Sequence, residues 1–117
     1  MEALEFDLPW PPSVNNYYRH VGPRVLVSRT GRRYREGVVA RLRGLLPKPL
    51  DGPVRLVAEF YPPDFRRRDA DNLLKIVQDC FTSAGLYHDD SQIAELHVFK
   101  REPVPPDGLA HFELGPA

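Results

Sequence analysis

Clusters of proline divide this chain of 117 residues into short segments, and this limits the secondary structure that it can form. Proline fixes φ and has no backbone N–H to donate, so it interrupts helices and the interior of sheets. Prolines gather at residues 9–12, 47–49 and 62–63. We therefore expect short strands and helices that begin or end at these places, within a single domain covering residues 1–117.

The apolar pattern predicts two helices and several strands. Residues 30–46 and 71–84 each place their apolar side chains on one helical face. Thr30 is expected to cap the first helix, and Gly85 to follow the end of the second. Strands are expected at residues 4–8, 24–28, 54–61, 92–100 and 111–114, with a loop over residues 13–18.

The order of these elements predicts an α+β fold. It would be a small mixed β-sheet with two amphipathic helices packed on one face. Ala94, Leu96 and Val98 share one face of the strand over residues 92–100, and they are candidates either for the core or for a dimer contact. Because a chain of this length has only a modest core, dimerisation would add buried surface.

The charge is unevenly distributed, although the net charge is zero. Residues 1–50 hold nine Lys and Arg against four Asp and Glu, and residues 51–117 hold seven against twelve, so the halves carry +5 and −5. A basic half is typical of nucleic-acid binding, but the arginines after Thr30 are equally consistent with a solvated helix face. The sequence has no apolar run of membrane-spanning length, no signal-like leader and one cysteine, Cys80. We therefore expect a cytoplasmic protein.

One segment combines strong cations with strong anions. Three arginines at residues 66–68 precede Asp69 and Asp71, Lys75 follows one helical turn later, and a second acidic pair lies at residues 89–90. Arginines bind phosphate oxygens, and carboxylates hold a hard cation such as Mg²⁺. The combination indicates phosphodiester chemistry at a magnesium site.

Structural interpretations of the same residues also exist. Asp69 or Asp71 could cap the helix, and Asp71 and Lys75 have the i, i+4 spacing of a surface pair worth about 0.2–0.5 kcal/mol. Neither role accounts for the arginines or for the second acidic pair. Asp-x-Asp pairs also serve nucleotide-sugar transferases and haloacid-type phosphohydrolases, which normally need larger α/β domains. We favour the metal site. Asn72 could cap the helix or support a metal ligand, and we favour the cap.

In its wider setting the motif resembles the RusA-type Holliday junction resolvases, a family of endodeoxyribonucleases. The resemblance covers roughly residues 6–102. The matching segments are, in chain order, Leu8-Pro9-Trp10-Pro11-Pro12-Ser13 with Asn15-Asn16-Tyr17-Tyr18-Arg19-His20, then Arg66-Arg67-Arg68-Asp69-Ala70-Asp71-Asn72-Leu73-Leu74-Lys75, then Ala84-Gly85-Leu86 with Asp89-Asp90-Ser91-Gln92.

The resemblance implies a homodimer that resolves four-way DNA junctions by paired nicks in opposed strands, in recombination and repair. It implies Mg²⁺ as the cofactor, with Mn²⁺ as a substitute. The residues implied in catalysis are Asp69, Asp71, Lys75 and Asp90, and the same three aspartates are the implied metal ligands, with Asp89 a weaker candidate. DNA contacts are expected from Arg66, Arg67, Arg68, Tyr17, Arg19, Arg32 and Arg33. Two alternatives stay open: a less selective metal-dependent nuclease, and an inactive junction-binding protein.

The position of Asp90 is constrained by the length of the chain. A helix over residues 71–84 is about 21 Å long. The six residues from Ala84 to Asp90 span about 20 Å when fully extended. Asp90 therefore barely reaches Asp69 and Asp71 within one chain. Three arrangements are possible: the helix is shorter than predicted, the loop after it runs back along the helix, or Asp90 meets the pair across a dimer interface.

The segment around Pro11 allows two interpretations. It could present Tyr17, Tyr18 and Arg19 for stacking on unpaired bases, or it could be a rigid strap that fills the core with Trp10. The four histidines show no metal-ligand spacing, so we expect no zinc site.

Overall fold

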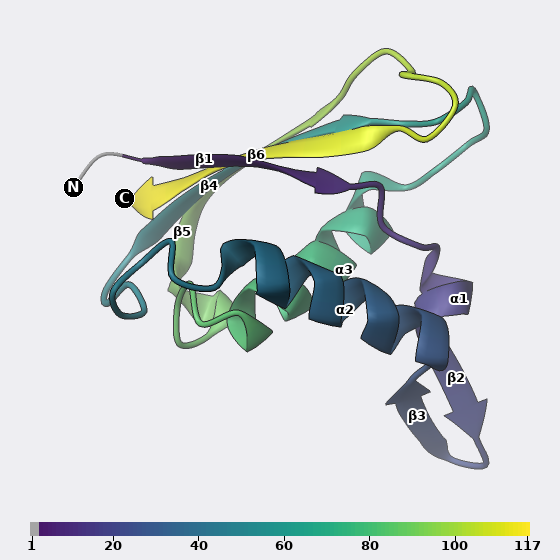
Figure 1. The fold of residues 1–117 in the computed structure, drawn as a ribbon, viewed down its shortest axis with the longest axis horizontal. Coiled ribbons are helices and arrows are strands. Elements are labelled where there is room, and N and C mark those ends of the chain that lie inside the picture. The colour runs from purple at the N-terminus through teal and green to yellow at the C-terminus, as the bar shows by residue number, and fades with distance from the viewer. Residues whose placement is uncertain (1–2) are drawn as a thin grey trace.

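The computed structural model describes residues 3–117 and contains a four-stranded mixed sheet. The strand order is β1-β6-β4-β5, in which β6 runs antiparallel to both neighbours and β5 runs parallel to β4. Helices α2 and α3 lie on the same face of this sheet (Figure 1). The predicted α+β fold is confirmed. The bounds are β1 Leu4–Pro9, α2 Arg29–Leu42, β4 Val54–Tyr61, α3 Ala70–Ser83, β5 Ile93–Lys100 and β6 Leu109–Pro116.

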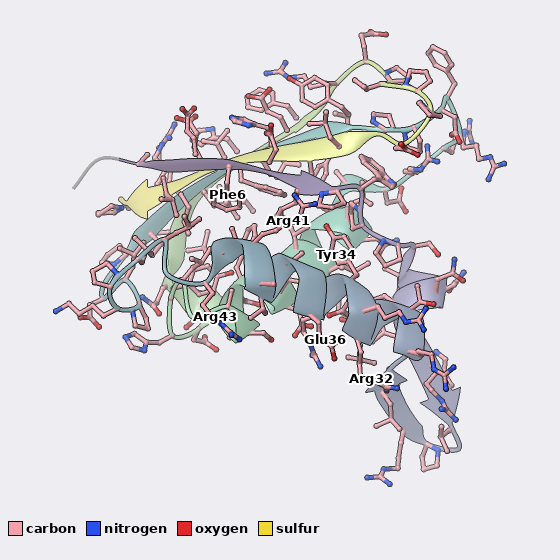
Figure 2. The ribbon with its side chains drawn as sticks, in the orientation of Figure 1. Phe6, Arg32, Tyr34, Glu36, Arg41 and Arg43 are labelled. Carbon is pink, nitrogen blue, oxygen red and sulfur yellow. The ribbon has the colours of Figure 1, made fainter. Side chains whose placement is uncertain are left out.

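The hydrophobic core lies between the sheet and the two helices. Alternate side chains of β4 and β6 are buried against one stripe of α3. The Phe112 ring of β6 lies 5.1 Å from Phe81 of α3 and 6.0 Å from Phe60 of β4, between ring centroids. Figure 2 shows Phe6 directed from β1 toward the helices. Aromatic side chains from four elements therefore meet at the centre of the core.

Helix α2 begins and ends earlier than the sequence predicts. Ser28, and not Thr30, is the N-cap, because its hydroxyl accepts a hydrogen bond of 3.0 Å from the Gly31 amide. The helix ends at Leu42, since Gly44 follows with φ of +81°. Arg32 and Glu36 on its outer face point away from the sheet, as does Arg43 just after its end (Figure 2).

Residues 13–27 contain more regular structure than the expected loop and single strand. A one-turn helix, α1 (Val14–Tyr17), is capped by Ser13, and a hairpin follows, made of β2 (Tyr18–Val21) and β3 (Arg24–Val27). A single helical turn is too short to show a periodic apolar pattern. The hairpin projects from the body of the domain (Figure 1) and exposes Val21, Val25 and Leu26.

The places of the last two strands in the sheet differ from what their sequence patterns suggest. Strand β5 is an edge strand, on which Leu96 is exposed and Val98 packs against the core. Gln92 precedes it in a short 3₁₀ turn, η1 (Asp90–Gln92). Strand β6 is longer than residues 111–114 and lies inside the sheet. Within residues 3–117, no helix has both the length and the apolar character that a membrane span requires.

Candidate active site

Asp69 and Asp71 lie together at the start of α3. Asp69 occupies the N-cap position but makes no side-chain cap hydrogen bond, and Asp71 lies in the first turn. Both side chains are exposed, and among residues 3–117 neither carboxylate has a hydrogen bond or ion pair. Asn72 is the third residue of α3 and does not cap it, contrary to expectation. The two carboxylates are therefore free to bind a ligand, and helix capping does not explain them.

Lys75 lies one turn further along the exposed side of α3. Its ammonium group is 5.1 Å from the centre of the Tyr18 ring, at the start of β2. Within residues 3–117 it forms no ion pair with Asp71, so the surface pair that the structural interpretation of these residues required is not made. An aromatic face attracts an ammonium cation, so the Tyr18 ring fixes the end of the Lys75 side chain on the side of α3 that carries Asp71.

Asp90 lies at the opposite end of α3. Its carboxylate accepts hydrogen bonds from the Thr82 hydroxyl at 2.9 Å and from the Tyr87 hydroxyl at 3.2 Å. Thr82 follows Asp71 by eleven residues, which is about 16 Å along a helix axis. Ligands of one Mg²⁺ all lie about 2.0–2.1 Å from it. Asp90 therefore cannot share an ion with Asp71 of the same chain.

The described part of the chain contains no group of three His, Cys, Asp or Glu side chains that could hold a metal. Asp69 and Asp71 contribute two carboxylates, and no other His, Cys, Asp or Glu of residues 3–117 completes a three-ligand group with them. The loop from Ala84 to Asp89 does not return toward them, because Leu86 and Tyr87 are buried beside the end of α3. Of the three arrangements that the sequence leaves open, the course of the chain excludes the two within one chain, and an Asp90 supplied across a dimer interface stays a prediction.

Asp89 has a structural role as the N-cap of η1. It caps η1 in a capping box: its side chain accepts from Ser91, and the Gln92 side chain accepts from the backbone of Asp89. The hydrogen bonds from Ser91 lower the pKa of Asp89 below its ordinary value. Gln92 also donates to the carbonyl groups of Leu50 and Gly52, so this box anchors the chain just before β5. The environment of Asp89 favours a cap over a metal ligand.

The three consecutive arginines have different environments. Arg68 forms an ion pair of 2.8 Å with Asp64 and lies 5.5 Å from the centre of the Trp10 ring. This pair, through the hydrogen bond from Arg68, lowers the pKa of Asp64. Arg66 and Arg67 are exposed. The Arg66 guanidinium lies 3.8 Å from the Asp64 carboxylate, which also accepts a 2.9 Å hydrogen bond from the Arg66 backbone N–H. The exposed side chains of Arg66 and Arg67 are thus available to bind a phosphate. Arg68 instead makes contacts within the protein, with Asp64 and Trp10.

The expectation that Tyr17 contacts DNA is wrong, because this residue is buried. Its side chain is fully buried, and its hydroxyl donates a hydrogen bond to Asp79 of α3. Burial and this hydrogen bond raise the pKa of Tyr17 far above its ordinary value. A buried ring cannot stack on a base. Arg19, Arg32 and Arg33 are exposed on β2 and α2, as a DNA contact requires.

Two residues that contact Asp90, Thr82 and Tyr87, belong to none of the sequence motifs and were not predicted. The only sequence signal for Thr82 is helical spacing, since Asp71, Lys75, Gln78 and Thr82 lie within one narrow stripe of α3. Tyr87 carries no such signal, because its burial depends on the loop conformation.

Comparison with known proteins decides the family. The sequence matches the family described as "Endodeoxyribonuclease RusA" over residues 9–106. The chain belongs to the RusA endodeoxyribonuclease family. The resemblance drawn from the sequence motifs is thereby confirmed, and the RusA match includes the proline segment, the arginines and all four candidate catalytic residues.

Several relatives share the name crossover junction endodeoxyribonuclease RusA. Those of Enterobacteria phage 82 and of Escherichia coli K12 are each 43% identical over 101 residues, covering 86% of this chain and 84% of the relative. That of Escherichia coli O139:H28 is 40% identical over 119 residues, covering 98% of both. The similarity to RusA therefore extends over nearly the whole length of these proteins.

Proposed function

We propose that this protein is a Mg²⁺-dependent, homodimeric endonuclease that resolves four-way DNA junctions by paired nicks in opposed strands, in recombination and repair in the cytoplasm. The observation that carries this proposal is the pair of free carboxylates, Asp69 and Asp71, beside two exposed arginines in a RusA-family chain. The relatives named as crossover junction endodeoxyribonucleases support the choice of substrate.

The donor set fits a hard divalent cation in part. Asp69 and Asp71 offer carboxylate oxygens, which Mg²⁺ prefers, and both are exposed and free of protein partners within residues 3–117. Mn²⁺ would substitute, since it accepts the same ligands. A bound ion would supply Lewis-acid polarisation of the phosphate and an activated water. The third carboxylate would come from Asp90 of a second copy.

The remaining side chains act as cations around the phosphodiester. Arg66 and Arg67 would bind phosphate oxygens and set the register of the DNA. Lys75 is held near Asp71 by the Tyr18 ring, where a fixed ammonium group would stabilise the negative charge that develops on the phosphate. Helping to deprotonate the attacking water is the other role that the position of Lys75 allows.

A two-fold arrangement of α3 helices would complete two sites at once. The exposed stripe of α3 begins at Asp71 and ends at Thr82, which holds Asp90. If two copies pack this stripe antiparallel, the Asp90 end of one chain faces the Asp71 end of the other. A two-fold interface repeats every contact, so both sites form together. Two equivalent sites are what paired nicking requires.

The proposed DNA surface extends from the catalytic residues to the β2–β3 hairpin. Arg19 lies on the hairpin, and Arg32 and Arg33 lie at the start of α2. The apolar side chains exposed on the hairpin, Val21, Val25 and Leu26, would pack on bases that are unstacked at the branch. Basic residues bind phosphates without regard to sequence, so this surface favours affinity over base recognition.

The decisive test compares a fixed four-way junction with matching linear duplex, in Mg²⁺ and in EDTA. We expect paired nicks on the junction alone, lost in EDTA and in Asp71→Asn, which still binds the junction. Asp107→Asn is the matched control, since Asp107 is an exposed aspartate in the β5–β6 loop.

Two results would replace the proposal. Equal cleavage of junction and duplex would indicate a less selective nuclease. Selective binding without cleavage in Mg²⁺ or Mn²⁺ would indicate a junction-binding protein.

A further inference from the structure

A cavity of about 480 Å³ lies directly beside Asp69. One side is the proline segment from Trp10 to Asn15, and the other is the first two turns of α3 together with Arg67 and Arg68. Ligand pockets in proteins are typically clefts of about 300–1,000 Å³ with mostly apolar walls. This cavity has the size of a small-molecule site, although the proposed reaction at Asp69 does not by itself require one.

The walls of the cavity are apolar and firmly held. Pro11, Leu73 and Ile76 are buried, and the half-buried Trp10 ring packs edge-on against Phe60 at 6.0 Å. The proline segment is attached to α2 by a hydrogen bond of 2.7 Å from the Tyr34 hydroxyl to the Pro9 carbonyl. These contacts lie within the protein itself, so they would hold the walls in place before a ligand enters, which lowers the entropic cost of binding.

The rim of the cavity carries both hydrogen-bond donors and hydrogen-bond acceptors. The amides of Asn15 and Asn72 line it, and among residues 3–117 neither side chain has a hydrogen-bond partner. Each amide offers two N–H donors and a carbonyl acceptor, the set that pairs with the edge of a base. Arg67 and Asp69 complete the rim.

Resting on the proposed function, we propose that this cavity receives one unstacked nucleobase from the nucleotide next to the cleaved phosphate. Its apolar walls suit the faces of a base, and the two amides suit its edge. Arg67 at the rim would bind the phosphate that joins this nucleotide to the next. Arg67 and Arg68 would attract a free phosphate ion, but such an ion would make no use of the apolar part of the wall, and the Asp69 carboxylate would repel it.

A base that enters the cavity must first leave the helical stack. Unstacking costs least where base pairs are already interrupted, as at a branch point. The cavity would therefore contribute to junction selectivity. The two amides would also impose a preference among the four bases beside the cut.

Binding of junctions that lack one base tests this inference without any cleavage. Dissociation constants are measured in EDTA for an intact junction and for junctions with one abasic nucleotide, placed in turn at each branch-point position. For the wild type, we expect one abasic position to weaken binding at least about fivefold, since contacts to one base contribute about 1–3 kcal/mol.

Two variants of neighbouring residues separate the cavity from the rest of the surface. Asn15→Trp fills the cavity from its exposed rim, and it should bind intact and abasic junctions equally. Asn16→Trp makes the same change one residue later, outside the cavity, and should behave as the wild type. In Mg²⁺, Asn72→Ala should reduce the differences in cleavage rate between junctions that carry each of the four bases beside the cut.

The outcomes distinguish the inference from the proposed function. Tight junction binding that ignores every abasic position would overturn the base site and leave the resolvase proposal intact. An abasic effect on binding without cleavage in Mg²⁺ or Mn²⁺ would keep the base site and overturn the nuclease. No binding to the intact junction would overturn both.

Discussion

The Asp90 carboxylate accepts a 2.9 Å hydrogen bond from Thr82, and this contact places it at the far end of α3 from Asp71. A second hydrogen bond, from the buried Tyr87, fixes the same oxygen. Because α3 is rigid along its length, one chain cannot bring the two aspartates together. If both serve one metal site, the site contains residues of two chains.

Mixed dimers test the origin of Asp90. A purified heterodimer of Asp71→Asn and Asp90→Asn chains should nick one strand of a junction, because one of its two sites keeps Asp71 from one chain and Asp90 from the other. Each homodimer should be inactive. Two different affinity tags allow the heterodimer to be isolated, and gel analysis of end-labelled strands counts the nicks.

The control for this experiment pairs Asp69→Asn with Asp71→Asn. These residues lie on the same helix end, so every site in that heterodimer has lost one of them. It should be inactive whichever chain supplies Asp90. An inactive Asp71→Asn and Asp90→Asn heterodimer that still binds the junction would contradict the shared site.

Thr82 is expected to position Asp90 without contacting DNA. Thr82→Val keeps the shape of the side chain but removes the hydroxyl that donates to Asp90, and it should slow nicking roughly 10- to 100-fold, as displacement of a catalytic group does. Junction affinity in EDTA should not change. Thr82→Ser keeps a hydroxyl and should restore most of the rate. A Thr82→Val enzyme with the wild-type rate would exclude this role.

Two glycines of α2 are expected to respond oppositely to alanine. At Gly31 an added Cβ would lie 2.4 Å from the Tyr17 carbonyl oxygen and 2.8 Å from a Val27 methyl group. Gly31→Ala should therefore destabilise the fold by about 1–3 kcal/mol. An added Cβ at Gly37 meets nothing within 4 Å, so Gly37→Ala should stabilise the fold by about 0.5–1 kcal/mol.

Urea denaturation of both variants measures these changes in unfolding free energy. Because both glycines lie in the same helix, the comparison separates close packing from helix propensity. A stabilised Gly31→Ala variant would show that α1 and β3 do not pack against α2 as described.

The stability of the sheet should depend on pH through His111. Its Nδ1 atom lies 2.5 Å from Asp7 of β1, and Glu5 and Glu59 lie near the same ring. The hydrogen bond to Asp7 raises the pKa of His111 above its ordinary value near 6.5. The folded state thus binds the proton more tightly, so the stabilisation is complete below about pH 6.5 and is lost as the pH rises through the raised pKa.

This change is measurable against His111→Gln. The difference in unfolding free energy between the two proteins should decrease from pH 6 to pH 8.5, by less than about 1 kcal/mol because the pair is partly exposed. Parallel pH profiles for wild type and variant would contradict the assignment.

The sequence by itself determined the features that depend on neighbouring residues. Proline positions and apolar periodicity predict β4 and α3 nearly to their ends, because φ restriction and side-chain spacing act over a few residues. The Asp69, Asp71 and Lys75 motif likewise lies within two turns of one helix. Together with the other matching motifs it indicated the family that the comparisons confirm, whereas the metal chemistry stays a prediction.

Only the tertiary structure decided which side chains meet across the fold. Tyr17 is buried because α2 and α3 pack over it, and Arg68 lies over the ring of Trp10. The distance between Asp90 and Asp71 follows from the course of the chain after α3. Each of these outcomes depends on packing between segments that are distant in sequence, and no local pattern records that packing.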